Sequence, residues 1–250
     1  MEGYGPTSYG DRFAEVYDEW YPGSDDVAAV VGFVAELAGS RPGRLLELGV
    51  GTGRLAIPLA VHGMDVYGVD TSSAMLDRLR ARDPDGRVTV AVGDMVDDQP
   101  AGPFDVVLVA YNTLFNLESA ERQASCFVAA AERLASEGAL VVEAFVPEDP
   151  PREGSSLVVR SMTASEVVLS VSSHDPVGQR AQGHFIHLAD GEAVRLRPWA
   201  IRYAPPAELD AMAAAAGLVL VARWEDFEQH PFGDDSPRHV SVYAPSRLGT

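Results

Sequence analysis

Short apolar runs alternate with amphipathic stretches between Arg44 and Phe145, and this alternation limits the possible folds of the 250-residue chain more than any other feature. Such alternation is typical of repeated β-α units, in which parallel strands form one sheet with helices on both faces. The predicted strands are Arg44–Leu48, Asp65–Val69, Val88–Val92, Phe104–Ala110 and Ala139–Phe145. The predicted helices are Asp25–Ala38 behind a Ser24 cap, Arg54–His62, a Ser72-capped stretch to Arg82, and Ser119–Leu134. The fold class is therefore α/β, with a Rossmann-like, doubly wound and mostly parallel sheet.

After Pro147 the pattern changes to β-rich segments separated by hairpin signals such as Asp190-Gly191. These signals predict an antiparallel β insertion after the fifth strand. The α/β pattern returns with a helix at Pro206–Ala216, closed by Gly217, and two further strands. We therefore expect a lid segment at residues 1–24, a Rossmann-like domain at 25–146 and 204–250, and an insertion at 147–203. The insertion is expected to cover the substrate or to form the contact of a homodimer.

The charge of the chain excludes several partners. Asp and Glu number 37 against 19 basic residues, which gives a formal net charge of -18. A negative field of this size repels nucleic acid and anionic membranes, so neither is expected as a partner. All the basic residues are arginine, which excludes Schiff-base chemistry. Cys126 is the only cysteine and lies on an apolar stretch, so we expect a core residue, no metal site and a cytoplasmic location.

The strongest chemical signal is a glycine-rich turn where the first strand meets a helix. Gly49, Gly51 and Gly53 alternate with other residues, and glycine permits the tight backbone that a closely bound cofactor needs. The second strand ends at Asp70, where ribose hydroxyls lie in doubly wound folds. The third is followed by Asp94 and Met95, which suit an adenine ring. Each of these signals alone also fits an ordinary turn. Together, the signals at the ends of the first three strands indicate one cofactor site.

The glycine spacing distinguishes between two cofactors. A dinucleotide fingerprint would need glycine at position 54 or 56, where the chain has Arg54 and Ala56. Glu47, just before the turn, would repel a pyrophosphate but favour the cationic sulfonium and amino group of S-adenosylmethionine (SAM), directly or through water. The residues therefore favour SAM over a nicotinamide dinucleotide.

With these motifs the sequence resembles the class I SAM-dependent methyltransferases, whose patterns match the segments at 47–53, 69–70, 93–95 and 104–107. The resemblance implies that Gly49, Gly51 and Gly53 line the methionine moiety, Asp70 holds the ribose, and Asp94 and Met95 hold the adenine. Further cofactor contacts are expected from the neighbouring positions Tyr17, Glu47, Thr71 and Ala110.

A narrower resemblance is to small-molecule enzymes that include the N,N-dimethyltransferases of nucleotide-linked amino sugars. It is carried by Tyr9, followed eight residues later by Tyr17-Asp18, and it implies a lid in which Tyr9 encloses cofactor and acceptor. The chain departs from that group at Asn116, where the group has a histidine. This leaves the aminosugar assignment and the use of a histidine base in doubt.

Catalytic candidates follow the fourth strand, at the sheet edge where ligands bind in this fold. They are Asn112 and Asn116, with Tyr9 from the lid. Methyl transfer from a sulfonium is an in-line displacement, so proximity supplies most of the catalysis, and a base is needed only for an acceptor that must lose a proton early. The expected product is S-adenosylhomocysteine, and the expected acceptor is a small molecule such as a natural-product or sugar intermediate. A SAM-binding regulatory or scaffold protein is the alternative outside enzymes, and a nicotinamide-dependent oxidoreductase is the alternative among them.

Overall fold

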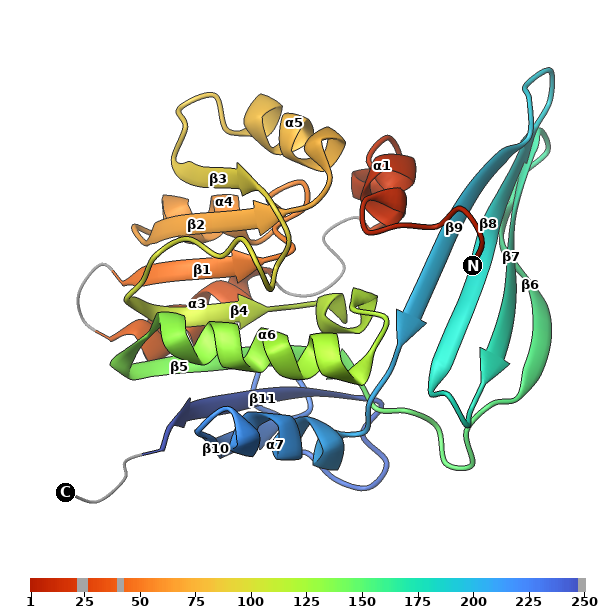
Figure 1. The fold of residues 1–250 in the computed structure, drawn as a ribbon. Coiled ribbons are helices and arrows are strands. Elements are labelled where there is room, and N and C mark those ends of the chain that lie inside the picture. Colours follow the sequence, from red (N-terminus) through yellow and green to blue (C-terminus); the bar gives the residue numbers. More distant parts are fainter. Residues whose placement is uncertain (22–26, 40–42, 247–250) are drawn as a thin grey trace.

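The computed structural model describes residues 1–21, 27–39 and 43–246 and contains a seven-stranded sheet (Figure 1). Its strand order is β10-β11-β5-β4-β1-β2-β3. Strands β1 to β5 run parallel, whereas β11 is antiparallel to both β5 and β10. The bounds are Arg44–Leu48 for β1, Asp65–Asp70 for β2, Val88–Val92 for β3, Phe104–Val109 for β4, Leu134–Phe145 for β5, Leu218–Trp224 for β10 and Arg238–Pro245 for β11. The predicted fold class is confirmed.

Helices cover both faces of this sheet. Alternate residues of β4 enter two different cores: Val107 and Val109 pack on one face, Val106 and Leu108 on the other. The first face carries α6 (Ala120–Arg133) and α7 (Pro206–Ala215), and the second carries α3 (Val27–Ala38), α4 (Ala56–Val61) and α5 (Ser73–Arg82). The caps expected at the starts of α5 and α6 form, because the side chain of Ser72 accepts from Met75 N–H and that of Ser119 from Arg122 N–H. The predicted Ser24 cap lies outside the described residues.

A second sheet, the insertion sheet, follows β5 in the chain and is antiparallel throughout. It contains β6 (Gly154–Met162), β7 (Glu166–Asp175), β8 (Arg180–Ala189) and β9 (Arg195–Arg202) in that order. Arg202 fixes its last strand to the main sheet's helices: its guanidinium donates to Gln123 on α6 at 2.6 Å and pairs with Glu208 on α7. The insertion sheet is therefore joined to the main sheet through a buried polar network as well as through the chain.

Two short helices, α1 (Ser8–Phe13) and α2 (Tyr17–Trp20), form an N-terminal segment, and Figure 1 shows α1 between the two sheets. Phe13 is fully buried there and packs edge-on against Phe185 of β8. On the other side the hydroxyl of Ser72 donates to Asp11 at 2.7 Å. Gly10 permits this approach, since a Cβ there would lie 2.4 Å from that of Ser72. Neither helix was predicted, because both depend on these tertiary contacts.

The largest difference from the predicted elements lies at the start of β5. The strand begins at Leu134 rather than Ala139, directly after α6, and its register against β4 shifts between Phe104 and Val106. A Cβ at Gly138 would lie 2.8 Å from the carbonyl oxygen of Phe104, so the irregular stretch needs glycine. This first part of β5, residues 134–138, contains polar residues, so an apolar run does not indicate it in the sequence. Among the described residues, no helix combines the length and the apolar character needed to cross a membrane.

Candidate cofactor and acceptor site

The glycine turn after β1 is held by backbone hydrogen bonds to the end of β2. Gly49 N–H donates to the carbonyl oxygen of Val69 at 2.8 Å, and Gly51 N–H donates to Oδ2 of Asp70 at 2.9 Å. Both glycines have positive φ, 74° and 55°, which other residues rarely adopt. A Cβ at Gly49 would lie 2.3 Å from Cγ2 of Thr113, so the turn is pressed against the segment after β4.

Asp70 is fixed by the same turn. Its second carboxylate oxygen accepts from Ser72 N–H at 2.9 Å. Burial raises the pKa of Asp70, whereas the two backbone hydrogen bonds lower it. Each carboxylate oxygen can accept more than one hydrogen bond, so the group keeps acceptor capacity for a ligand hydroxyl.

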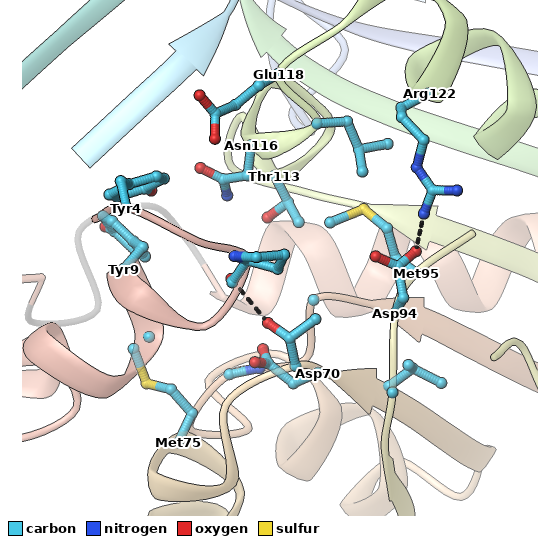
Figure 2. Close-up of a pocket in the computed structure, with 18 of the residues that line it drawn as sticks. Tyr4, Tyr9, Asp70, Met75, Asp94, Met95, Thr113, Asn116, Glu118 and Arg122 are labelled. Atoms are coloured by element: carbon cyan, nitrogen blue, oxygen red, sulfur yellow. Dashed lines mark hydrogen bonds and ion pairs between the residues drawn. The ribbon is translucent and has the colours of Figure 1, made fainter. Parts of the chain in front are cut away.

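Asp94 lies at the end of the neighbouring strand β3. Its Oδ1 accepts from Val96 N–H at 2.7 Å and from the guanidinium of Arg122, on α6, at 2.6 Å. Figure 2 shows Arg122 reaching down to Asp94 beside Met95. The carboxylate expected to meet adenine is therefore already paired with a cation at the cavity edge.

These groups line one cavity of about 260 Å³ (Figure 2). Figure 2 shows Tyr9 of α1 and Tyr4, which precedes α1, facing Asp94 and Arg122 across the cavity. Thr113 and Asn116 of the 3₁₀ helix η1 (Thr113–Asn116) lie along another side. Nine predicted site residues share its lining: Tyr9, Tyr17, Gly49, Gly51, Asp70, Thr71, Asp94, Met95 and Asn116.

Three other predicted site residues lie outside this lining and have structural partners instead. A Cβ at Gly53 would lie 2.8 Å from Leu79 of α5, so this glycine serves helix packing. Ala110 is buried in the core on the α3 face. Asn112 has a φ of 62°, and its side-chain oxygen accepts from Phe145 N–H at 2.6 Å, which joins the ends of β4 and β5.

Glu47 also lies outside the lining of this cavity. It is 5% exposed, and burial raises the pKa of its carboxyl to about 8, against a smaller lowering by Arg54 and by a hydrogen bond from Ala56 N–H. At neutral pH the group is mostly protonated in this state. An interaction of Glu47 with the sulfonium or amino group of SAM would require the carboxyl to lose its proton when the cation binds, and this interaction stays a prediction.

Tyrosines crowd the side of the site nearest the N-terminal segment. The ring of Tyr21 lies 5.0 Å from that of Tyr17 and 5.7 Å from that of Tyr111, and Arg54 stacks on Tyr111 at 4.8 Å. Burial is the main cause that raises the pKa of Tyr9 and of Tyr17. These phenols are therefore neutral hydrogen-bonding groups rather than bases.

Comparisons with known proteins agree with this geometry. Residues 45–138 match the family model described as a methyltransferase domain. The cypemycin N-terminal methyltransferase of Streptomyces sp is 30% identical over 85% of this chain and 87% of its own length. The dTDP-3-amino-3,4,6-trideoxy-alpha-D-glucopyranose N,N-dimethyltransferase of Streptomyces venezuelae is 30% identical over 88% of this chain and 94% of its own length. The solved structure of the CcbJ methyltransferase from Streptomyces caelestis is 41% identical, with a TM-score of 0.90 over 97% of this chain and 100% of that one.

The chain belongs to the SAM-dependent methyltransferases. The methyltransferase cavity fits this cofactor: the Cβ position of Gly51 is open, with the nearest atom 4.0 Å away, so the absent side chain leaves room at the wall. Two carboxylates, Asp70 and Asp94, stand at successive strand ends beside it. The predicted enzyme class and cofactor are confirmed.

Sequence reasoning missed several lining residues of the methyltransferase. Thr113 follows the fourth strand, in the same segment as Asn112 and Asn116, and could have been predicted in the same way. Tyr4, Met75 and Arg122 come from elements whose approach to the cavity no sequence motif indicates.

Asp226, Glu228 and His230 bring their ligand atoms within 4.8 Å of one another on the loop after β10. The cluster is mostly exposed and has no other sign of a ligand.

Proposed function

We propose that the methyltransferase transfers the methyl group of SAM to an amine nitrogen of a small natural-product or sugar intermediate. One observation carries the proposal: a single cavity joins the strand-end carboxylates to neutral tyrosines and an asparagine. A neutral amine attacks with its lone pair and releases its proton afterwards, so it needs no strong base before transfer. The printed names of the two relatives, an N-terminal methyltransferase and an N,N-dimethyltransferase, support nitrogen as the acceptor atom.

The residues have distinct roles in this proposal. Gly49 and Gly51 bring backbone close to the methionine part, Asp70 binds the ribose, and Asp94 with Met95 binds the adenine. When bound, SAM supplies an activated methyl group. Tyr17 contacts the cofactor. Tyr9 and Asn116 hydrogen-bond the acceptor and hold it in line, and proximity of this kind is worth roughly 7 to 11 kcal/mol.

The test is a methylation assay with isotope-labelled SAM and matched acceptors that differ only in carrying an amine or a hydroxyl. Mass spectrometry should find the label on the amine of an aminosugar, amino acid derivative or peptide N-terminus. Transfer only to the hydroxyl members would overturn the nitrogen assignment. Failure with every acceptor, despite tight binding of S-adenosylhomocysteine, would favour the regulatory alternative.

The net charge of -18 supports a small acceptor rather than nucleic acid. A cytoplasmic location stays a prediction from the single, buried Cys126.

A further inference from the structure

A second cavity, of about 640 Å³, lies between the end of β5 and the insertion sheet. Its walls are mostly apolar and aromatic. Phe145 is the last residue of β5, Trp199 and Ile201 belong to β9, and Tyr203 lies just beyond β9. The rings of Phe145 and Tyr203 are 6.1 Å apart. This volume lies in the range of small-molecule sites, which are concave and mainly apolar with a few polar groups.

The mouth of this second cavity is acidic. Four exposed carboxylates lie around it: Glu148, Asp149, Asp234 and Asp235. Arg152, which also lines it, is paired with Glu148 at 3.3 Å. His174 is the other basic group, and burial lowers its pKa, so it is neutral at pH 7. The field at the mouth therefore attracts cations and repels phosphates.

Aromatic contacts connect the lining of the second cavity to that of the first. The ring of Phe145 packs edge-on against Phe115 at 5.1 Å, and Phe115 belongs to η1, whose Thr113 and Asn116 line the first cavity.

The insertion sheet gives a second connection. Trp199 pairs with Gly183 of β8, and two residues further along the same face of β8 lies Phe185, which contacts Phe13. Phe13 stacks on Tyr9 at 4.2 Å, and Tyr9 lines the first cavity.

We infer that the second cavity binds the remote part of the acceptor, and that this part carries an aromatic or alkyl group and a positive charge. The inference rests on the proposed function, because it assigns the second cavity to the same acceptor. It also restricts the substrate class: an acceptor held here has no phosphate or nucleotide diphosphate in its remote part, because four carboxylates with one paired arginine would repel it.

Tryptophan fluorescence tests the inference without a known substrate. The probes are 2-phenylethylamine, a cation at pH 7, and 3-phenylpropanoate, an anion of similar size. The signal of Trp199 is isolated by comparison with Trp199→Phe, which keeps an aromatic ring beside Gly183. We expect the amine to perturb Trp199 emission and to bind more tightly than the anion, and the double variant Asp234→Asn/Asp235→Asn to weaken amine binding by about three- to tenfold.

Asp77→Asn/Asp85→Asn is the matched control, since it removes two exposed carboxylates on and after α5 and should leave amine binding unchanged. Equal affinity for the two probes, or no response of Trp199, would overturn the inference.

A kinetic experiment separates this inference from the proposed function. With any amine acceptor found in the labelled-SAM assay, Asp234→Asn/Asp235→Asn should raise KM by a similar factor and retain kcat, because the remote part binds equally in the ground and transition states. Methylation with an unchanged KM would reject the second cavity and leave the proposed function intact. Absence of methylation, with the amine still perturbing Trp199, would reject the function and leave only a binding site.

Discussion

Asp70 accepts hydrogen bonds from two backbone N–H groups at the point where the glycine turn meets β2. We expect Asp70→Ala to weaken the binding of SAM and S-adenosylhomocysteine by roughly 1.5 to 3 kcal/mol, the scale of hydrogen bonds to a charged group, through the ribose contact and the loss of an anchor for Gly51. Titration calorimetry measures this. Asp65→Ala, at the exposed start of the same strand, is the control and should bind normally. Unchanged affinity in Asp70→Ala would show that Asp70 does not contribute to cofactor binding.

Glu47 makes the stability of the ligand-free protein depend on pH. Its carboxyl ionises near 4.5 when unfolded and near 8 when folded, so the unfolded state binds fewer protons between these values. The contribution of Glu47 to the free energy of unfolding should therefore fall by on the order of 3 kcal/mol as pH rises from 5 to 8. This fall should be absent in Glu47→Gln.

Urea unfolding at several pH values measures the slope for Glu47. Glu36→Gln, on an exposed position of α3, is the control and should retain the wild-type slope. A slope in Glu47→Gln equal to that of the wild type would show that Glu47 does not titrate in this range.

At the scale of elements, the N-terminal segment is held by contacts that can separate. Asp18 accepts from the hydroxyl of Thr52 at 2.7 Å and pairs with Arg82 at 2.8 Å, which joins α2 to the glycine turn and α5. If the segment closes over bound cofactor, amides of residues 5–21 should exchange faster in the free protein than with S-adenosylhomocysteine, because a lid must open for exchange. Hydrogen exchange with mass spectrometry measures this, and equal protection in both states would show a fixed wall.

A lid role for Tyr9 also predicts the effect of removing its hydroxyl. Tyr9→Phe should leave Tm nearly unchanged, because the stacking on Phe13 is retained, while kcat falls through loss of a contact to cofactor or acceptor. Tyr67→Phe, on β2 and outside the cavity, is the control and should match the wild type in kcat. A loss of Tm as large as the loss of activity in Tyr9→Phe would indicate a structural role instead.

Strands and long helices could be predicted from the sequence because burial on one or both faces leaves a periodic pattern, as in β4, and because caps such as Ser119 are local. The positions of Gly51, Asp70 and Asp94 at one cavity could also be predicted, because the carboxyl ends of parallel strands lie at the same edge of a sheet. Side-chain direction within a turn is not encoded in this way: the positive φ of Asn112 turns it toward Phe145, away from the cavity. Arg122 reaches Asp94 only because of how α6 packs.

At the scale of the whole molecule, the outer face of the insertion sheet exposes an apolar surface. Cross-strand pairing places Val159, Leu169, Ile186 and Leu196 in one row on the same face. Leu157 is 65% exposed, Val159 54% and Leu196 51%. Exposed apolar patches of this kind mark interaction sites, so we expect two copies of the chain to pack through this face, as one reading of the sequence anticipated.

Sedimentation at micromolar concentration tests the dimer. The wild type should sediment as a dimer and Leu157→Asp/Leu196→Asp as a monomer that still binds S-adenosylhomocysteine. Val61→Asp changes an equally exposed valine at the end of α4 and should stay dimeric. A monomeric wild type would exclude this interface.

The position of β11 has a consequence for synthesis on the ribosome. It pairs with β5, yet about 90 residues, including the whole insertion sheet, separate Phe145 from its partner Arg238. While those residues are made, the insertion hairpins can form from neighbouring segments, but the edge of β5 that later pairs with β11 stays unpaired, and the strand itself carries the apolar residues Val141 and Val142. We therefore expect a nascent chain that pauses in this interval to expose this strand edge for longer and to be more prone to aggregation.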